Sequence, residues 1–313
     1  MAANYESSSI TVLCDHFVTG APQAEWVAAG VDGLFNVSSI TMNLPIVSIS
    51  DTVDKIQMAD ELKNGSGMDK VNTALELARC TGDVTHLLHA YTVESIFYRV
   101  LNRTLANQLP STDLTELISM FNALKNGTHK KATLNWALCY ASTIRHACIS
   151  PESSLKYYFG KTYRGINVTE QDLLVYHVNS FIIQKTFAST SKDRSVAECF
   201  VVSSGPGQIP AICTYVLDDP DMKFFIDIGD MGAIRGEEEV LILPFSMFMI
   251  SKIDRTKNNN FIEIELTVPT TTRIESLDLN DWEPSDNMIN WAMNLIDIPT
   301  LMAGIDIDDM TSD

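Results

Sequence analysis

Positive charge is scarce in this chain of 313 residues. Lys and Arg number 22 against 40 Asp and Glu, which gives a formal net charge of −18. Wrapping nucleic acid or binding an anionic membrane requires clustered Lys and Arg, so the composition argues against both partners. The surplus of carboxylates instead favours a cationic partner, such as an arginine-rich protein.

Long apolar runs and an export signal are also missing. No apolar stretch reaches the roughly 18 residues that suggest a membrane span, so none is expected. The first residues, 1–7, have neither the basic nor the apolar region of a signal peptide. We therefore expect a cytoplasmic protein, with secretion by an unconventional route left open.

Common signatures of metal, disulfide and phosphate sites are absent as well. The six cysteines show no C-x-x-C spacing, and a buried free thiol is the commoner outcome for cysteines in apolar runs. His86 and His89 share a helix face but have no third ligand nearby, so no metal is expected. The triplet 160–162 is no phosphate-binding loop, because Leu155 stands where that motif needs glycine.

The pattern of apolar residues divides the chain into four segments. Residues 1–67 form an N-terminal extension of uncertain structure, with short apolar runs broken by Gly and Pro. Residues 68–150 show helical spacing and predict a helical lobe. Residues 151–272 predict a β-rich core. Residues 273–313 form an acidic tail with ten acids and one base.

Predicted elements in the two central segments give an α+β fold class. Four helices are expected in the lobe, including one long amphipathic stretch over 84–109 and a helix opened by a capping box over 113–124. A further short helix is expected over 193–200. The β-rich runs are 157–168, 181–190, 209–216, 224–228, 238–243 and 261–268.

The acidic tail also contains large apolar side chains. Trp282, Ile289 and Trp291 are too apolar for a solvated segment, so we expect them to pack on the body of the protein. The end, 306–313, is expected to be mobile. A wholly disordered tail is the alternative.

Three short motifs in the core carry groups suited to one chemistry. They are Tyr163-Arg164-Gly165, Phe187-Ala188-Ser189-Thr190-Ser191 and Glu237-Glu238-Glu239. An arginine presents a fork of donors that suits phosphate, and Gly165 would let a ligand approach the backbone. A carboxylate at Glu239, held just before an apolar strand, could stabilise a developing cation. Glu237 would lie on the same side if the backbone is extended.

Each motif has a structural alternative. Arg164 could be a strand arginine paired with a surface acid, and Ser189 could belong to a polar run at a sheet edge. The glutamates could form a charged hairpin tip before a buried strand.

In order, spacing and flanking residues, the three motifs together resemble the arginine-directed mono-ADP-ribosyltransferases of the R-S-E class. The resemblance covers about residues 68–268, and it implies a helical lobe packed on a mixed-β core of two small facing sheets. It also implies NAD as substrate, no metal, and transfer of ADP-ribose to an arginine-bearing acceptor protein. The sequence departs from the family after the last motif, where Leu243-Pro244-Phe245 replaces a common Pro-Pro.

The resemblance also implies a role for each site residue. Arg164 would bind the cofactor phosphates, and Ser189 would orient Glu239. Glu239 would stabilise the ribosyl cation, and Glu237 would engage the acceptor guanidinium. Gly165 and Phe187 would complete the cofactor-binding set, although a core position is more typical of a phenylalanine such as Phe187.

Two other functions stay open. NAD glycohydrolysis, with water as acceptor, would need Glu239 but depend less on Glu237. A non-catalytic binding module that retains the fold would use the acidic tail as its working surface.

Overall fold

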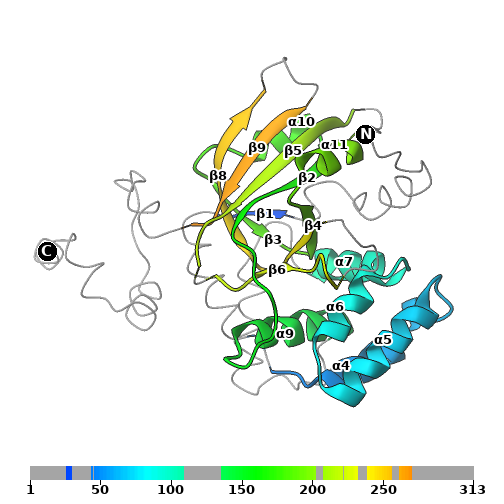
Figure 1. Ribbon diagram of the computed structural model, residues 1–313. Coiled ribbons are helices and arrows are strands. Elements are labelled where there is room, and N and C mark those ends of the chain that lie inside the picture. The colour runs from blue at the N-terminus through cyan, green and yellow to red at the C-terminus, as the bar shows by residue number, and fades with distance from the viewer. Residues whose placement is uncertain are drawn as a thin grey trace, which may run out of the picture.

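The computed structural model places a lobe of helices against a mixed β-sheet, which is an α+β architecture (Figure 1). It describes residues 26–29, 44, 46–108, 135–201, 207–220, 222–231, 238–255 and 261–269. The predicted helix over 113–124 and the acidic tail lie outside these residues. No helix in these ranges is long and apolar enough to cross a bilayer.

Local sequence signals determine where the helices of the lobe begin and end. Ser48 caps α4 by accepting a hydrogen bond from the Asp51 amide, and Asn135 caps α9 through the Leu138 amide. Gly82 ends α5 in the left-handed conformation that glycine adopts without strain. The helices are α4 (Ile49–Met58), the 3-10 helix η1 (Asp60–Leu62), α5 (Met68–Thr81), α6 (Thr85–Thr92), α7 (Phe97–Gln108) and α9 (Trp136–Ile149).

Two features of the lobe differ from expectation. The single helix expected over 84–109 is broken between α6 and α7, because the Ser95 hydroxyl accepts from the Phe97 amide and donates to the Val93 carbonyl. The lobe also begins before residue 68, since α4 packs on both α5 and α9. Thr52 of α4 shares a buried 2.7 Å hydrogen bond with Thr143 of α9.

Nine strands are hydrogen-bonded in the order β1-β3-β8-β9-β5-β2-β4-β7-β6, and all pairs except β5–β9 are antiparallel. All six β-rich runs expected from the sequence contain strand. The strands are β1 (Trp26–Ala29), β2 (Gly160–Val168), β3 (Phe181–Gln184), β4 (Ala188–Ser191), β5 (Ile209–Leu217), β6 (Phe225–Asp227), β7 (Glu239–Ile242), β8 (Met247–Asp254) and β9 (Ile262–Thr267).

The sheet was not predicted in full. The run 181–190 divides into β3 and β4, and β1 and β8 were missed. The methionine-rich run that becomes β8 is continuously apolar, and such a run does not distinguish a buried strand from a buried helix by its period. Two short helices, α10 (Glu170–Val175) and α11 (Arg194–Phe200), lie on the sheet, and the second matches the helix expected over 193–200.

The sheet folds back on itself into two facing parts. Only one register pair, Tyr163 with Ser191, joins β2 to β4. Across this junction Phe225 of β6 packs on Phe248 of β8, with ring centroids 5.9 Å apart, and Tyr215 of β5 packs on the same ring at 5.1 Å. The two small facing sheets implied by the resemblance are therefore present, joined through a single point.

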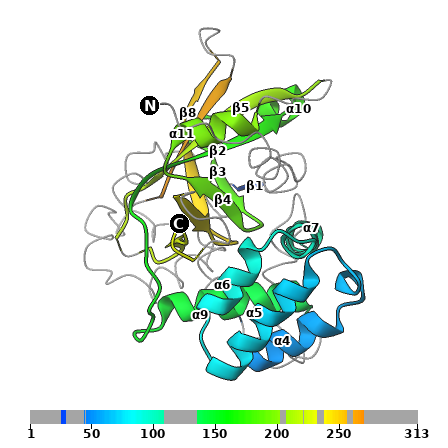
Figure 2. The same cartoon turned by 45° about the vertical axis from the view of Figure 1, so that its right-hand side comes forward.

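Strands β4 and β7 separate two apolar cores. Ala188, Val240 and Ile242 point into the core between the two parts of the sheet. Phe187 and Leu241 point into the core of the helical lobe. Figures 1 and 2 show β4 on the side of the sheet that meets α6 and α7. This arrangement places the middle motif where the lobe and the sheet meet.

Candidate active site

Strand pairing brings three of the motif residues together. Ser191 lies directly opposite Glu239 in the β4–β7 pair, and Ser189 lies two residues along on the same face. Arg164 of β2 donates from Nη1 to the Ser189 carbonyl at 2.8 Å. Arg164 and Ser189 are buried, whereas Glu239 is partly exposed. One guanidinium, one hydroxyl and one carboxylate thus meet at the junction of the two parts of the sheet.

Opposing effects act on the Glu239 carboxylate. Burial raises its pKa above the ordinary value and is the larger effect, while a hydrogen bond with the Ser189 side chain and the charge of Arg164 lower it. Ser189 and Arg164 therefore favour the ionised form in a place that otherwise disfavours charge. A carboxylate in such surroundings interacts strongly with any positive charge that develops beside it.

Two residues of the helical lobe complete the site, and sequence reasoning did not identify them. Asn102 of α7 donates to the Tyr91 hydroxyl of α6 at 3.3 Å, and the Ser189 side chain lowers the pKa of Tyr91, which burial raises more strongly. In the sequence Tyr91 is simply one apolar position of an amphipathic stretch. Its ring meets Phe187 of the middle motif only through the packing of α6 on the sheet, which no local pattern encodes.

Gly165 has a different role from the one expected. A Cβ atom added to it would lie 2.3 Å from the Ala197 carbonyl oxygen and 2.9 Å from a Val201 methyl group. The space beside this glycine is thus filled by α11, and the missing side chain allows that helix to pack on β2. The structure gives no support to close approach of a cofactor at this position.

Phe187 occupies the core position that was the alternative to a cofactor contact. It is fully buried, and its ring lies 5.4 Å from Tyr91 and 5.6 Å from Tyr140. Stacking on nicotinamide would require this ring to leave the core of the helical lobe. In this structure Phe187 instead joins the sheet to the lobe.

The backbone before Glu239 is not extended. Glu237 lies outside the described residues, but Glu238 has φ +46°, which is left-handed and uncommon for a residue with a side chain. The carbonyl of Glu238 accepts from the Lys192 amide at 3.1 Å, which holds this turn against the end of β4. The argument that placed Glu237 beside Glu239 on an extended strand therefore does not apply.

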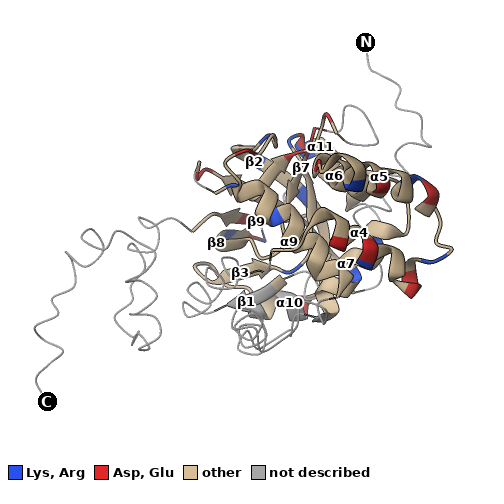
Figure 3. Cartoon of the chain, turned by 90° about the horizontal axis from the view of Figure 1, so that it is seen from below, with Lys and Arg blue, Asp and Glu red and all other residues tan. Residues whose placement is uncertain are grey.

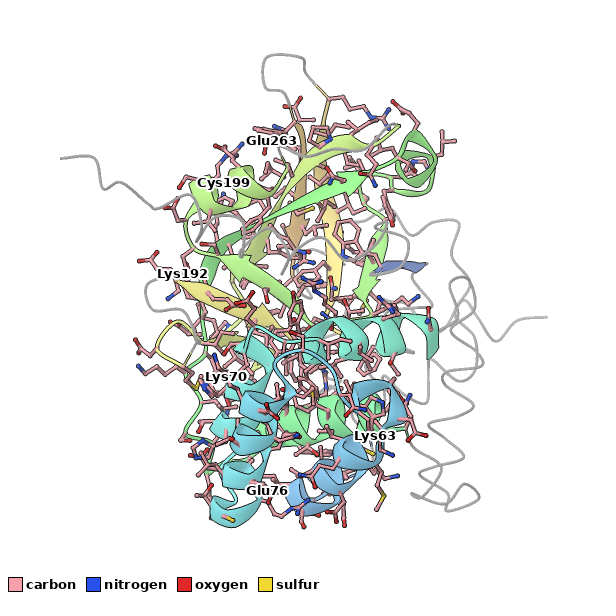
Figure 4. The ribbon with its side chains drawn as sticks, turned by 90° about the vertical axis from the view of Figure 1, so that its right-hand side faces the viewer. Lys63, Lys70, Glu76, Lys192, Cys199 and Glu263 are labelled. Atoms are coloured by element: carbon pink, nitrogen blue, oxygen red, sulfur yellow. The ribbon has the colours of Figure 1, made fainter. Side chains whose placement is uncertain are left out.

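The segment 227–231, which begins at the end of β6, has a contact with the helical lobe and one with the end of β4. His89 of α6 hydrogen-bonds through Nδ1 to the Met231 carbonyl at 2.9 Å. Lys192 pairs with Asp227 at 2.7 Å, and Figure 4 shows Lys192 between Cys199 of α11 and Lys70 of α5. The lobe and the sheet thus both contact the segment 227–231.

Charged side chains are spread over the described parts of the chain. Blue and red segments are interspersed over the ribbon in Figure 3, and the basic residues do not form a stripe. No group of three or more His, Cys, Asp or Glu side chains there could hold a metal ion.

No protein-family model and no curated protein matches this chain. Among solved structures it is similar to the Vis toxin, an ADP-ribosyltransferase from Vibrio splendidus, at 18% identity and a TM-score of 0.42, covering 67% of this chain and 87% of the toxin. It is also similar to the Clostridium limosum C3 exoenzyme, at 15% identity and a TM-score of 0.39, covering 64% of this chain and 95% of that protein.

A third similar structure is exoenzyme S from Pseudomonas aeruginosa in complex with human 14-3-3 protein beta and carba-NAD. The identity is 14% and the TM-score 0.39, covering 79% of this chain and 98% of that protein. At TM-scores below 0.5 this likeness assigns no function, so the case for one has to come from the residues of this chain.

Proposed function

We propose that this protein transfers ADP-ribose from NAD to arginine side chains of acceptor proteins and releases nicotinamide. The observation that carries the proposal is the meeting of Arg164, Ser189 and Glu239. The three residues come from three strands and belong to three motifs whose order resembles the R-S-E class. Arg164 as a strand arginine paired with a surface acid is disfavoured, because it is buried against the Ser189 carbonyl.

In the proposed reaction the bond between C1′ of the ribose and nicotinamide breaks, and its electron pair leaves with the nicotinamide. The ribose then carries positive charge, which the ionised Glu239 stabilises. A guanidine nitrogen of the acceptor bonds to C1′, and the proton it releases passes to Glu237. Arg164 binds the phosphates, and Ser189 keeps Glu239 ionised and oriented.

The proposal is tested by incubating the protein with labelled NAD and either polyarginine or agmatine. We expect labelled acceptor from the wild type and a loss of at least about a hundredfold in Glu239→Gln, the size typical when a group that stabilises transition-state charge is removed. Glu238→Gln is the matched control, because it makes the same change at the adjacent, exposed side chain. Equal labelling by wild type and Glu239→Gln would contradict the proposal.

NAD glycohydrolysis is a second candidate, and the left-handed backbone at Glu238 favours it. That turn removes the geometric reason for placing Glu237 beside Glu239. Glu237→Ala separates the two activities. Loss of transfer to agmatine with retained nicotinamide release supports an acceptor role for Glu237, whereas equal loss of both removes it.

A binding module without catalysis is the third reading. Titration calorimetry with NAD distinguishes it from an enzyme, which should bind its substrate in the micromolar to millimolar range. Absence of binding at millimolar NAD would favour the module.

A further inference from the structure

Lys192 contacts both ends of the segment that joins β6 to β7. Its ammonium group lies 2.7 Å from Asp227 Oδ2, at the end of β6. Its backbone amide donates to the Glu238 carbonyl at 3.1 Å, directly before β7. Lys192 follows the middle motif in the chain, and Figure 4 shows it above Lys70 of α5. One residue at the end of β4 therefore holds the two ends of this segment together.

The Asp227 carboxylate uses one oxygen for each of two contacts. Oδ2 accepts from Lys192, and Oδ1 accepts from the Gly229 amide at 3.3 Å. The Ile228 amide donates to the Glu239 carbonyl at 3.0 Å, which joins the two chain directions at the same level. The turn after β6 is thus tied both to the lysine side chain and to the first residue of β7.

The surroundings of the Lys192 ammonium group limit the positions open to it. The nitrogen lies 5.1 Å from the centroid of the Tyr158 ring, and the Tyr158 amide donates to the Phe225 carbonyl of β6 at 2.9 Å. The side chains of Lys192 and Asp227 are 25% and 27% exposed. Because water and salt screen such a pair less than a fully exposed one, it is better suited to hold a fixed geometry.

The turn held by Lys192 has an unfavourable backbone conformation. The left-handed φ of +46° at Glu238 persists in a residue with a side chain only where its surroundings hold it, and the bond from the Lys192 amide is one such restraint. Glu239 is positioned separately, because β4 pairs with β7 and Thr190 Oγ1 donates to the Val240 carbonyl at 2.8 Å. Lys192 therefore acts on the chain before Glu239 more than on Glu239 itself.

We propose that Lys192 is a positioning residue that fixes the turn at Glu238 and so favours transfer to an arginine acceptor over hydrolysis of NAD. Glu237, the residue proposed to engage the acceptor, is bonded directly to Glu238 and lies outside the described residues. Without the lysine side chain, Glu239 would stay in β7, but the direction of the chain before it would vary. The role in acceptor choice rests on the proposed function, whereas the fixing of the turn does not.

The alternative is that Lys192 forms an ordinary surface ion pair without effect on the reaction. The pair of Lys156 with Asp230 provides the comparison. Its atoms lie 2.5 Å apart and involve the same segment after β6, but the two side chains are 68% and 81% exposed. Water and salt screen such a pair, so it should contribute little. Lys156→Met thus removes a lysine ion pair from the same segment and leaves the contact between Lys192 and Asp227 in place.

The test compares Lys192→Met with Lys156→Met in the full chain. Transfer of label from NAD to agmatine and release of nicotinamide are measured side by side. In Lys192→Met we expect the ratio of transfer to release to fall about tenfold, the factor that corresponds to one hydrogen bond between charged groups, with KM for NAD unchanged. Lys156→Met should keep the wild-type ratio. Lys192→Arg should keep most of it, because arginine can still donate to Asp227.

A double variant shows whether Lys192 acts through Asp227. In an Asp227→Asn background, Lys192→Met should lower the ratio of transfer to release no further, because the ion pair is already gone. Additive effects would overturn the proposal, as would the same ratio in Lys192→Met and the wild type. A wild type that releases nicotinamide but labels no agmatine would also overturn the role in acceptor choice.

Hydrogen exchange of the Ile228 amide, followed by NMR, distinguishes failure of this proposal from failure of the proposed function. We expect exchange to be faster in Lys192→Met than in the wild type, and unchanged in Lys156→Met. Equal exchange in Lys192→Met and the wild type would show that the lysine does not fix the turn, whatever the activity. A wild type that releases no nicotinamide would contradict the proposed function, while the exchange would still decide whether Lys192 fixes the turn. If Lys192→Met does not fold, Asp227→Asn is measured in its place, with Asp230→Asn as its control.

Discussion

Glu239 lies in surroundings that favour reactivity over stability. Its pKa is raised in the folded protein, chiefly by burial, so the folded state binds its proton more tightly than the unfolded chain does. The stabilising contribution is therefore fully present below the unfolded pKa, and it is lost as pH rises through the raised, folded value. At neutral pH the ionised carboxylate makes the protein less stable.

The destabilising effect of the ionised Glu239 at neutral pH predicts how Glu239→Gln changes stability. We expect its melting temperature to exceed that of the wild type at pH 7, and the difference to shrink as pH falls through the range in which carboxylates titrate. Thermal unfolding measured from pH 3 to pH 8 checks this. Glu238→Gln controls for the simple loss of one negative charge. A Glu239→Gln variant that is less stable than the wild type at pH 7 would contradict the expectation.

Gly165 is predicted to be required for packing, not for contact with a ligand. In Gly165→Ala the new methyl group would approach the Ala197 carbonyl to 2.3 Å, so α11 would have to move away from β2. Overpacking of this kind costs about 1–3 kcal/mol. Urea unfolding measures it, and Gly229→Ala is the control, because its Cβ would have only ordinary contacts from 3.5 Å. Equal stability of both variants would show that α11 adjusts freely.

At the scale of elements, α9 is joined to the sheet through Arg145. The guanidinium is buried, lies 3.7 Å from the centroid of the Phe224 ring and donates to the Pro244 carbonyl at 3.1 Å. Burial lowers the pKa of Arg145 to about 9. This contact fixes the helical lobe against the turn between β7 and β8. The turn follows directly on β7, the strand that begins with Glu239.

Arg145→Lys should weaken this junction even though it keeps the charge. Lysine has no planar group to stack on Phe224 and is more strongly hydrated, so burying it costs more. We expect a loss of about 1–3 kcal/mol in the free energy of unfolding, measured with urea. Arg79→Lys is the control, because Arg79 forms its ion pairs with Asp54 and Glu76 near the surface and should change by less than about 1 kcal/mol. Equal losses would contradict a special role for the buried arginine.

The elements also show what the sequence can and cannot predict. The runs that become β2, β4 and β7 are visible locally, because stretches of β-branched and apolar residues are bounded by turn residues there. The break at Ser95 depends on hydrogen bonds between neighbouring backbone and side-chain groups, which the apolar period does not register. Strand β1 was missed because four residues carry little pattern of their own, and its strand state depends on pairing with β3.

The candidate site divides in the same way. Arg164, Ser189 and Glu239 could be named because each lies in a motif of recognisable type and order. Tyr91 and Asn102 could not, because their contacts join segments far apart in the chain. The resemblance to the family assigned Gly165 and Phe187 to contact with the cofactor. Only the packing of α11 and of the helical lobe reveals what these two residues contact.

At the scale of the whole molecule, the net charge of −18 bears on the choice of acceptor. An acidic protein attracts an arginine-rich protein over a distance of about 10 Å at moderate salt, and this attraction raises the rate of encounter. Agmatine, with one guanidinium and one ammonium group, carries far less charge than such a protein and gains less from the attraction. Raising NaCl from 20 to 200 mM should therefore lower kcat/KM severalfold for an arginine-rich protein and much less for agmatine.

Half of that net charge belongs to residues 273–313, which have ten acids and one base. Truncation after Thr272 should therefore weaken the salt dependence with the protein acceptor and leave the rate with agmatine unchanged. If Trp282 and Trp291 pack on the body, truncation should also lower the melting temperature by several degrees, as expected for the loss of a few buried large side chains. The two effects are independent. An unchanged melting curve with a weaker salt dependence would identify a solvated tail that attracts the acceptor, and unchanged values of both would show that the tail contributes to neither.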